Sequence, residues 1–376
     1  MSVIVSSTPD IRLVMTTDAV GGVWTYALDL ARGLAPSGVQ TTLVVLGPAP
    51  KPDQLVEAGD IPGLELVETG LTPDWSAGEL ADIREAGAVV RGVARGARAD
   101  LIHLNTPALA YDGGFCAPLV GACHSCLATW WSDVRDGPMP HELRWRSAAQ
   151  WQGLINCDVN LAPTAAFAEA TARTYEIPRP FVVHNGRRAS GVAPAPRERF
   201  AFTAGRLWDE GKNLGLLDAA AARLDAPVYA AGPLESPAGS RVALSTVRSI
   251  PRLSADEMSR WLTRAGVFVS TALYEPFGLT VLEAAQTGCP LVLSDIRTLR
   301  ELWDGAAVFV DPYDAEGLAS AIQQILDNGE LAAQLGAAAR IRAARYSVQA
   351  MAAGVRDVYR MVAPQLFLPS RREAAA

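Results

Sequence analysis

Tyr274-Glu275-Pro276-Phe277-Gly278-Leu279-Thr280-Val281-Leu282-Glu283 places two carboxylates eight residues apart, separated by a Pro-Phe-Gly turn and an apolar run that starts a helix. These carboxylates would not share a face of one continuous helix, so we expect Glu275 in the loop and Glu283 on the opening turns of the helix. The free N–H groups at a helix start are a ready site for phosphate. Two acids beside it repel phosphate but bind hydroxyl groups. The stretch therefore favours a ligand with hydroxyl groups on both sides of a phosphate, such as a sugar joined to a nucleoside diphosphate.

Length and composition set the broad class. The chain has 376 residues, which suits two domains better than one. Its net charge of −7 argues against nucleic acid as a partner. No apolar run is long enough to cross a bilayer, and the first five residues lack the basic and apolar regions of a signal peptide. Five cysteines, an odd number, then predict reduced thiols and a cytoplasmic protein.

One pair of cysteines, in Cys123-His124-Ser125-Cys126, has the spacing of a redox motif or of half a zinc site. The sequence contains no second pair to complete a zinc site, and no thioredoxin-like pattern surrounds this one. Neither interpretation is favoured over two ordinary thiols after a strand.

Strand-like and helix-like segments alternate along the chain, which predicts parallel sheets covered on both faces by helices. Residues 48–78 are rich in Pro, Gly and acids, and are expected to be irregular around a single strand. Ser254 and Glu257 have the spacing of a capping box at a helix start. Strands are expected at 11–15, 41–46, 64–67, 101–104, 119–122, 200–204, 228–231, 267–270, 291–294 and 308–310, and helices at 23–35, 214–224, 255–265, 279–287 and onward to about 362.

The segment 186–199 holds Gly, Pro, Ala and Arg without periodicity and is the expected linker. It divides the chain into a Rossmann-like domain at 1–185 and a second one at 200–362, followed by a tail at 363–376 whose Ala-rich end is expected to fray. Arg84, Arg91 and Arg95 share one helical face of the first domain. That face could contact anionic lipid head groups, or it could simply be solvated.

Two cations follow the first strand of the second domain. Arg206 ends Phe202-Thr203-Ala204-Gly205-Arg206, and Lys212 begins the next helix. Because ligands of open parallel sheets bind beyond the carboxyl ends of the strands, both cations are expected at the ligand site. A guanidinium that forks onto oxygens and an ammonium point charge suit a diphosphate, although two surface cations at loop ends would look the same.

Taken together, these motifs resemble the retaining family-four glycosyltransferases of GT-B fold. The resemblance covers both halves of the chain in the family order. It rests on Gly21-Gly22, Val183-His184-Asn185-Gly186, Ala204-Gly205-Arg206 with Lys212-Asn213, Glu275-Pro276-Phe277-Gly278 with Glu283-Ala284, and Gly288-Cys289-Pro290. It implies two Rossmann-like α/β/α domains that face each other across a deep cleft. The first domain would bind a hydroxyl acceptor such as a glycan, a glycolipid or a small molecule, and the second a nucleotide-sugar donor.

The resemblance also implies roles for individual residues. Arg206 and Lys212 would bind the donor diphosphate and stabilise it as the leaving group. Glu283 would accept hydrogen bonds from the ribose, and Glu275 from the transferred sugar. His124 matches a family position near that sugar. The remaining donor contacts would come from the backbone of Gly21 and Gly22 and from the N–H groups of Phe277, Gly278, Leu279 and Thr280.

Two departures from the family pattern concern neighbouring positions. Arg187 follows Asn185-Gly186, where an aliphatic residue and then Asp are common, and this leaves the contacts at the domain junction open. Thr271-Ala272-Leu273 stands where a Pro-Ser pair is frequent, and this leaves the contacts to the donor sugar open.

Preorganised cations and N–H dipoles stabilise the negative charge on a departing phosphate. The retaining family is usually described with a front-face route in which that phosphate helps take the acceptor proton, so Glu275 would not be a nucleophile. The sequence contains no Asp-x-Asp pair of the kind that holds a metal on a nucleotide-sugar. Because Arg206 and Lys212 would supply the positive charge, we expect no metal and no other cofactor.

The residues that would bind the acceptor are harder to identify from the sequence. Trp24, Trp130 and Trp131 lie in or beside loops of the first domain, where a sugar ring could stack on them, but buried tryptophans more often serve packing. The sugar and the base are open, with UDP-sugars as the default. Other readings are a GT-B sugar-nucleotide epimerase and a non-catalytic two-domain sugar-binding protein. A phosphorylase would need a pyridoxal lysine, and the chain has only Lys51 and Lys212.

Overall fold

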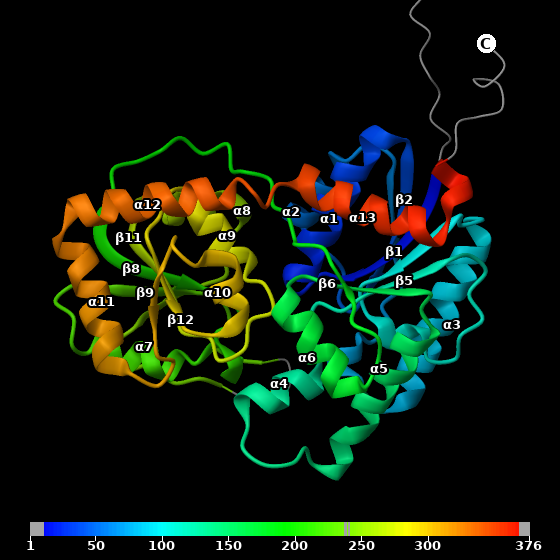
Figure 1. Cartoon of the computed structure of the whole chain (residues 1–376), viewed down its shortest axis with the longest axis horizontal. Helices are drawn as coiled ribbons and strands as arrows, with labels where there is room; N and C mark the ends of the chain where they lie inside the picture. The colour runs from blue at the N-terminus through cyan, green and yellow to red at the C-terminus, as the bar shows by residue number, and fades with distance from the viewer. Residues whose placement is uncertain (1–10, 237–238, 240, 368–376) are drawn as a thin grey trace, which may run out of the picture.

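The computed structural model describes residues 11–236, 239 and 241–367, and shows two α/β domains side by side (Figure 1). Every strand pair within the two sheets is parallel. The first sheet has the order β3-β2-β1-β4-β5-β6-β7 and the second the order β10-β9-β8-β11-β12-β13. This confirms the predicted fold class. The strands of the first sheet are β1 (Ile11–Asp18), β2 (Val39–Leu46), β3 (Leu64–Glu68), β4 (Leu101–Leu104), β5 (Leu119–Ala122), β6 (Val159–Ala162) and β7 (Phe181–Val182).

The second sheet contains all five strands expected for that half, together with one that was not foreseen. Its strands are β8 (Glu198–Ala204), β9 (Val228–Ala231), β10 (Arg248–Ile250), β11 (Ala265–Ser270), β12 (Leu291–Ser294) and β13 (Val308–Val310). Every residue of β12 is buried, as expected for a strand covered by helices on both faces. The short edge strand β10 has a mostly exposed, polar sequence, so it offered no apolar pattern to detect.

Helices cover both sheets. Those of the first domain are α1 (Gly22–Leu34), α2 (Pro52–Gly59), α3 (Leu80–Gly96), α4 (Leu127–Val134), α5 (Arg144–Asn156) and α6 (Ala165–Tyr175). After the linker come α7 (Leu214–Ala221), α8 (Ala255–Arg264), α9 (Leu279–Gln286), α10 (Arg297–Trp303), α11 (Ala315–Asp327), α12 (Gly329–Ala343) and α13 (Val348–Val362). The predicted capping box is present at α8, where Ser254 Oγ accepts from the Glu257 N–H and the Glu257 carboxylate accepts from Ser254.

One part of the prediction for residues 48–78 was wrong, because α2 lies within this supposedly irregular stretch. Pro52 occupies the first turn, where its missing N–H costs nothing. The Gln54 side chain reaches back and accepts from the Lys51 N–H at 2.9 Å, which caps the start of the helix. Only Gln54 and Ala58 of this helix are buried, and its large apolar residues Leu55 and Val56 are exposed, so no continuous apolar stripe faces the core.

The last long helix, α13, crosses back to the first domain, over α1 (Figure 1). Met351, Val355 and Tyr359 lie in the hydrophobic core formed by β1, β2 and α1. The two helices approach so closely that a Cβ on Gly33 would lie 2.7 Å from Ala352 Cβ. The predicted division placed residues 348–362 in the second domain, but in the structure they pack against the first. In the predicted tail, residues 364–367 form a short 3-10 helix, and the Ala-rich end lies outside the described residues. The first five residues of the chain, considered above for a signal peptide, also lie outside them.

Within the described residues, no helix is both long enough and apolar enough to span a membrane. On α3, Arg84 Nε pairs with Asp112 at 3.0 Å, and the Arg91 guanidinium lies 5.8 Å from the Phe115 ring centre. Two of the three arginines on this face therefore have partners within the protein. A lipid contact of α3 stays a prediction.

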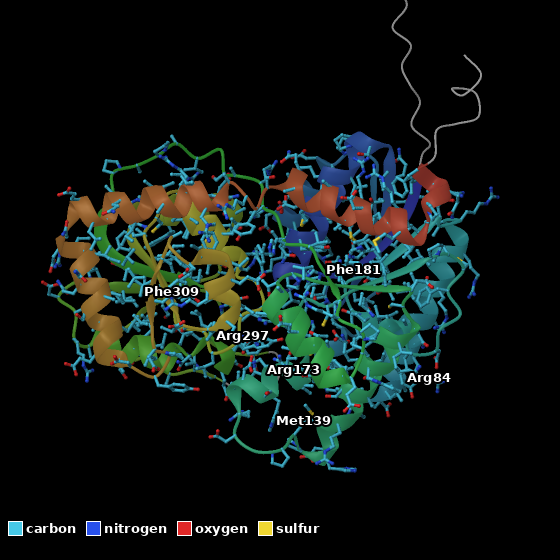
Figure 2. All side chains as sticks on the ribbon, viewed as in Figure 1. Arg84, Met139, Arg173, Phe181, Arg297 and Phe309 are labelled. Atoms are coloured by element: carbon cyan, nitrogen blue, oxygen red, sulfur yellow. The ribbon has the colours of Figure 1, made fainter. Side chains whose placement is uncertain are left out.

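The domains touch at several places, among them the end of α4, where Arg135 Nη2 lies 2.6 Å from Glu210 Oε1. Where the linker and the segment between α12 and α13 cross, the Arg187 N–H donates to Tyr346 O at 3.1 Å, and the Ser347 carbonyl fills the place of a side chain on Gly186. Farther along, α6 meets α10: Glu301 accepts from the N–H groups of Ala165 and Ala166, both at 2.8 Å. Arg297 of α10 and Arg173 of α6 lie at this boundary (Figure 2).

Candidate active site

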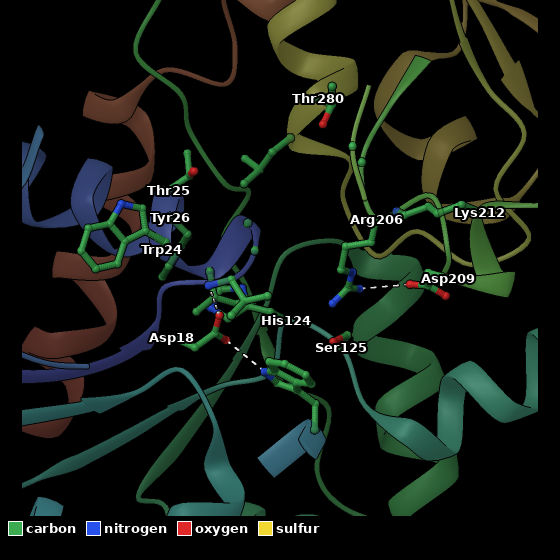
Figure 3. Close-up of a pocket in the computed structure, with 18 of the residues that line it drawn as sticks. Asp18, Trp24, Thr25, Tyr26, His124, Ser125, Arg206, Asp209, Lys212 and Thr280 are labelled. Carbon is green, nitrogen blue, oxygen red and sulfur yellow. Dashed lines mark hydrogen bonds and ion pairs between the residues drawn. The ribbon is translucent and has the colours of Figure 1, made fainter. Parts of the chain in front are cut away.

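A cleft of about 1110 Å³ lies between the domains and is lined by residues of both. The loops that follow β1 and β5 line one side of the cleft, and the loops that follow β8 and β11 line the other (Figure 3). All of these loops leave the carboxyl ends of parallel strands, which is the edge where open α/β sheets bind ligands. All of the site residues that the sequence suggested line the cleft, except Trp131.

Lys212 and Glu275 meet inside the cleft. The Lys212 Nζ lies 2.6 Å from Glu275 Oε2, and both side chains are mostly buried. Lys212 ends a short turn, Glu210–Lys212, whose shape depends on Asn213 in a left-handed conformation (φ 53°). Asn can adopt this conformation more readily than most residues. The predicted ammonium and loop carboxylate thus form one charge pair.

Arg206 points into the space between the domains (Figure 3). Its side chain is 43% exposed, and its Nη2 lies 3.1 Å from Asp209 Oδ2. The other oxygen of Asp209 accepts from the Gly211 N–H at 3.0 Å and from Trp130 Nε1 of the first domain at 3.1 Å. Asp209 was not singled out from the sequence, although it lies between the two predicted cations.

The start of α9 faces the same space. Gly278, in a left-handed conformation (φ 85°), turns the chain into the helix, and no side chain caps the first turn. Its N–H groups are therefore available to an anion. From the other domain, a Cβ on Gly22 would lie 3.2 Å from the Leu279 side chain, so the Gly21-Gly22 loop already reaches α9. The Phe277 ring itself is buried in the hydrophobic core of the second domain, so only its backbone is available to a ligand.

Glu283 lies deeper along the cleft and has a partner that was not foreseen. Its Oε1 accepts from Arg187 Nε at 2.7 Å, and 22% of its side chain remains exposed. The sequence marked Arg187 as a departure from the family pattern without indicating what it contacts.

His124 borders the cleft from the first domain (Figure 3). The Asn105 amide is oriented by its donation to Thr16 O, so its Oδ1 accepts from His124 Nε2 at 2.8 Å. This bond assigns the proton to Nε2 and leaves Nδ1 as an acceptor. Burial lowers the pKa of His124 to about 4, so the ring is neutral at neutral pH.

The three tryptophans proposed for the acceptor have different environments. Trp130 lines the cleft, whereas the Trp131 indole donates to Gly137 O at 3.2 Å and is not among the lining residues. Trp24 lines the cleft but is 3% exposed and belongs to the first hydrophobic core. Of the three, Trp130 offers the best placed ring.

Two acids and two further indoles also border the first-domain side, namely Asp18, Asp74, Trp75 and Trp145. The Trp75 Nε1 lies 3.4 Å from Asp18 Oδ2. Burial and the neighbouring Asp18 carboxylate raise the pKa of Asp74 to about 6. Asp18 ends a strand and could have been found by the rule that identified Arg206. Asp74 and the indoles lie in loop and helix segments that carry no such signal.

Arg146, which borders the same region, is committed elsewhere. Its guanidinium donates to the backbone oxygens of Asp74, Trp75 and Ala77. It therefore holds the turn that carries Asp74 and Trp75 through both terminal nitrogens, while its Nε has no partner among the described residues. Among the described residues, no group of three or more His, Cys, Asp or Glu side chains is arranged to hold a metal ion.

Two family models match the chain in succession. One, described as Glycosyltransferase Family 4, matches residues 20–189, and the other, described as Glycosyl transferases group 1, matches residues 192–342. The chain has the GT-B fold, and each of its halves matches a glycosyltransferase family. These two matches cover both lobes of the cleft, and they do not favour an epimerase or a non-catalytic sugar-binding protein.

Individual glycosyltransferases are similar to different extents. Glycogen synthase of Mycobacterium tuberculosis is 37% identical over 31% of this chain, but the chain covers only 29% of that relative. D-inositol 3-phosphate glycosyltransferase of Streptomyces scabiei is 27% identical over 91% of this chain and 87% of its own length.

Solved structures show the same fold. Sucrose-phosphate synthase of Thermosynechococcus elongatus superposes with a TM-score of 0.80 at 20% identity, over 94% of this chain and all of the other. Anabaena HepE, solved in complex with UDP and glucose, superposes with a TM-score of 0.69 at 16% identity, over 93% of this chain and all of the other.

Proposed function

We propose that this glycosyltransferase moves a sugar from a nucleoside-diphosphate sugar to a hydroxyl acceptor, with retention of the anomeric configuration and without a metal. The observation that carries the proposal is the pairing of Lys212 with Glu275 beside the uncapped start of α9. A cation, a set of N–H dipoles and a carboxylate stand together where a diphosphate and a sugar hydroxyl would have to be bound side by side.

The donor would lie across this arrangement. Lys212, Arg206 and the first turn of α9 would receive the diphosphate, and would stabilise the charge that develops on it as it departs. Because these groups already supply positive charge, the transfer would need no divalent ion. UDP is the preferred nucleotide in this proposal, since the fold neighbour HepE was solved with UDP and glucose.

Retention would follow a front-face route in which the departing phosphate takes the acceptor proton. Glu275 is held by Lys212 at 2.6 Å, which suits a residue that binds hydroxyl groups better than one that attacks carbon. His124, neutral because burial lowers its pKa to about 4, would accept a sugar hydroxyl at Nδ1. No group of the first domain would then have to change its charge during the reaction.

The acceptor would bind on the first-domain side, between Asp18, Asp74 and the indoles of Trp75 and Trp130. Two carboxylates repel an acceptor phosphate, and the nearby Arg146 is already engaged with backbone oxygens. We therefore propose a hydroxylated acceptor that carries no phosphate or carboxylate. In this respect it would differ from the substrate named in D-inositol 3-phosphate glycosyltransferase, one of the relatives.

The test is the release of nucleoside diphosphate from UDP-, GDP- and ADP-sugars, with and without a panel of sugar and polyol acceptors. Proton NMR of the product would report the anomeric configuration. The expected result is acceptor-dependent release of UDP with a retained anomer. Conversion of the donor into an epimer would overturn the transferase proposal, and an inverted product would overturn retention alone.

A further inference from the structure

Arg187 is anchored by its backbone to the second domain. Its N–H donates to Tyr346 O at 3.1 Å, and its carbonyl accepts from Gln286 Nε2, at the end of α9, at 2.8 Å. It is the first residue of the linker after Gly186, whose missing side chain leaves room for the Ser347 backbone. The two segments that connect the domains therefore pass each other at this residue, and the Cα of Arg187 moves with α9.

The Arg187 side chain, in contrast, reaches the first domain. Its Nε lies 2.7 Å from Glu283 Oε1, while its Nη1 lies 2.9 Å from Asp29 Oδ2 on α1 and 4.0 Å from Glu57 on α2. Only 12% of the side chain is exposed. Burial by itself lowers the pKa of Arg187, but Glu283 and Asp29 raise it well above its ordinary value. The guanidinium is thus a permanent charge shared by carboxylates of both domains.

Asp29 is the first-domain partner of the Arg187 guanidinium. Its side chain is fully buried. Oδ2 pairs with Arg187 Nη1, and Oδ1 lies 3.1 Å from Arg32 Nη1. It does not line the cleft, so it has no direct route to a ligand. It lies on α1, the helix that the Gly21-Gly22 loop begins, and the orientation of α1 therefore sets the position of the Asp29 carboxylate.

We propose that Arg187 is a positioning residue for the donor and makes nucleotide affinity depend on how the domains are closed. By holding Oε1 of Glu283, it fixes the carboxylate and directs Oε2 toward the ribose hydroxyls. Because Asp29 holds the other end of the guanidinium, a shift of α1 changes the orientation of Glu283. The inference rests on the proposed function in one respect, namely that Glu283 binds the nucleoside.

The structure suggests a variant that breaks the connection without touching the ligand, Asp29→Asn. The side chain keeps its shape but loses its charge, so the pull on Arg187 from the first domain weakens. Arg187→Lys is the second variant, because an ammonium cannot fork onto Glu283 and Asp29 together. Arg199→Ala is the matched control, since Arg199 pairs with Asp225 and Asp327 on the outside of the second domain.

Titration of UDP by calorimetry gives the nucleotide Kd, and initial rates give kcat. We expect Asp29→Asn and Arg187→Lys to raise the Kd by roughly tenfold, the middle of the usual range of coupling between sites. The kcat at saturating donor should stay within about twofold, because a contact that is equal in ground and transition states affects binding alone. Arg199→Ala should match the wild type in both. Thermal unfolding identifies the variants that are folded at the assay temperature, and only these are compared.

A double-mutant cycle separates positioning from a general loosening of the structure. In a Glu283→Gln background, Asp29→Asn should have almost no further effect on the UDP Kd, since the affected contact is already gone. An undiminished tenfold effect in that background would overturn the route through Glu283. Wild-type affinity in both folded single variants would overturn the inference while leaving sugar transfer intact. A wild-type protein that neither binds nor releases nucleotide would overturn the proposed function as well.

Discussion

The two sides of the cleft present different charged groups to the proposed ligands, a positive set on one side and a negative set on the other, and are built in different ways. On the second-domain side, Lys212, Arg206 and the start of α9 present positive charge from loops that each join one strand to the next helix. On the first-domain side, Asp18 and Asp74 present negative charge between indoles drawn from several separate segments. For the proposed reaction, this difference would let the site distinguish donor from acceptor by charge, because an anionic donor would be attracted to the second-domain groups and repelled by Asp18 and Asp74.

The strongest way to break this contrast is to remove the positive side. Lys212→Ala and Arg206→Ala should each lower kcat by about 10²- to 10³-fold, as for other groups that stabilise transition-state charge. Lys212→Ala also leaves Glu275 without its partner at 2.6 Å, so it should be the more harmful of the two. Initial rates at saturating donor measure the loss, and circular dichroism checks the fold. Near-normal turnover in both variants would contradict the assignment.

The second test concerns the carboxylates that flank the proposed diphosphate site. Glu275→Gln should lower kcat by roughly 10- to 100-fold with donor Kd nearly unchanged, because the transferred ring gains positive charge in the transition state. Glu283→Gln should instead raise the donor Kd and leave kcat nearly alone, since the ribose does not change during the reaction. Calorimetry and initial rates on both variants measure the two effects. A Glu275→Gln enzyme that turns over normally but binds donor poorly would show that the sugar lies elsewhere.

The third test addresses the negative side. With matched acceptors such as glucose and glucose 6-phosphate, we expect the wild type to prefer the unphosphorylated acceptor by roughly tenfold or more in kcat/KM, about 1.4 kcal/mol. The double variant Asp18→Asn/Asp74→Asn should reduce that preference, because it removes the repulsion and keeps the side-chain volumes. Product formation with each acceptor gives the ratio. An unchanged ratio would mean that the acceptor does not lie between these residues.

The fourth test measures the same acidic side through stability. The pKa of Asp74 is raised to about 6 by burial and by Asp18, so the folded protein binds this proton more tightly than the unfolded chain does. The resulting stability is fully present below pH 4 and is lost as the pH rises through about 6. Asp74→Asn should therefore gain of the order of 1 kcal/mol relative to the wild type between pH 5 and pH 7.5, after allowance for partial solvent screening.

Urea unfolding of both proteins at the two pH values provides the comparison. Because other groups titrate equally in the two proteins, only the difference between them is interpreted. An offset that stays constant with pH would show that Asp74 is ionised like an exposed carboxyl.

The smallest expected effect is that of a chelator. If Lys212 and Arg206 supply the charge for the diphosphate, transfer in excess EDTA should stay within about twofold of the untreated rate. The control is a metal-dependent transferase assayed in parallel. Loss of activity that Mg²⁺ or Mn²⁺ restores would show that the positive side of the cleft is incomplete without an ion.

The same contrast explains what could be predicted from the sequence. Glu275, Gly278 and Lys212 act within short segments, where local spacing already fixes the geometry, and all three line the cleft. The second sheet could be predicted because strands such as β12 are short apolar runs, and such a run is typical of a strand buried on both faces.

The proposed acceptor side could not be found in this way, because Asp74 and Trp145 come to line the same cleft only after distant segments fold together. For the same reason, the sequence marked Arg187 as unusual but could not supply its partner Asp29, 158 positions away. The helix α13 was misplaced because its amphipathic pattern specifies a buried face without specifying the sheet that buries it.

The return of α13 to the first domain also sets an order of events during synthesis. A ribosome releases the chain from its N-terminus, and domains generally fold as units as they emerge. The second domain, from β8 to α12, has its whole core once residue 346 has emerged. The core of the first domain still lacks Met351, Val355 and Tyr359 at that moment, although its sheet was made first. The second domain is therefore the first to complete its core, and the first domain acquires its last helix only when nearly all of the chain has left the ribosome.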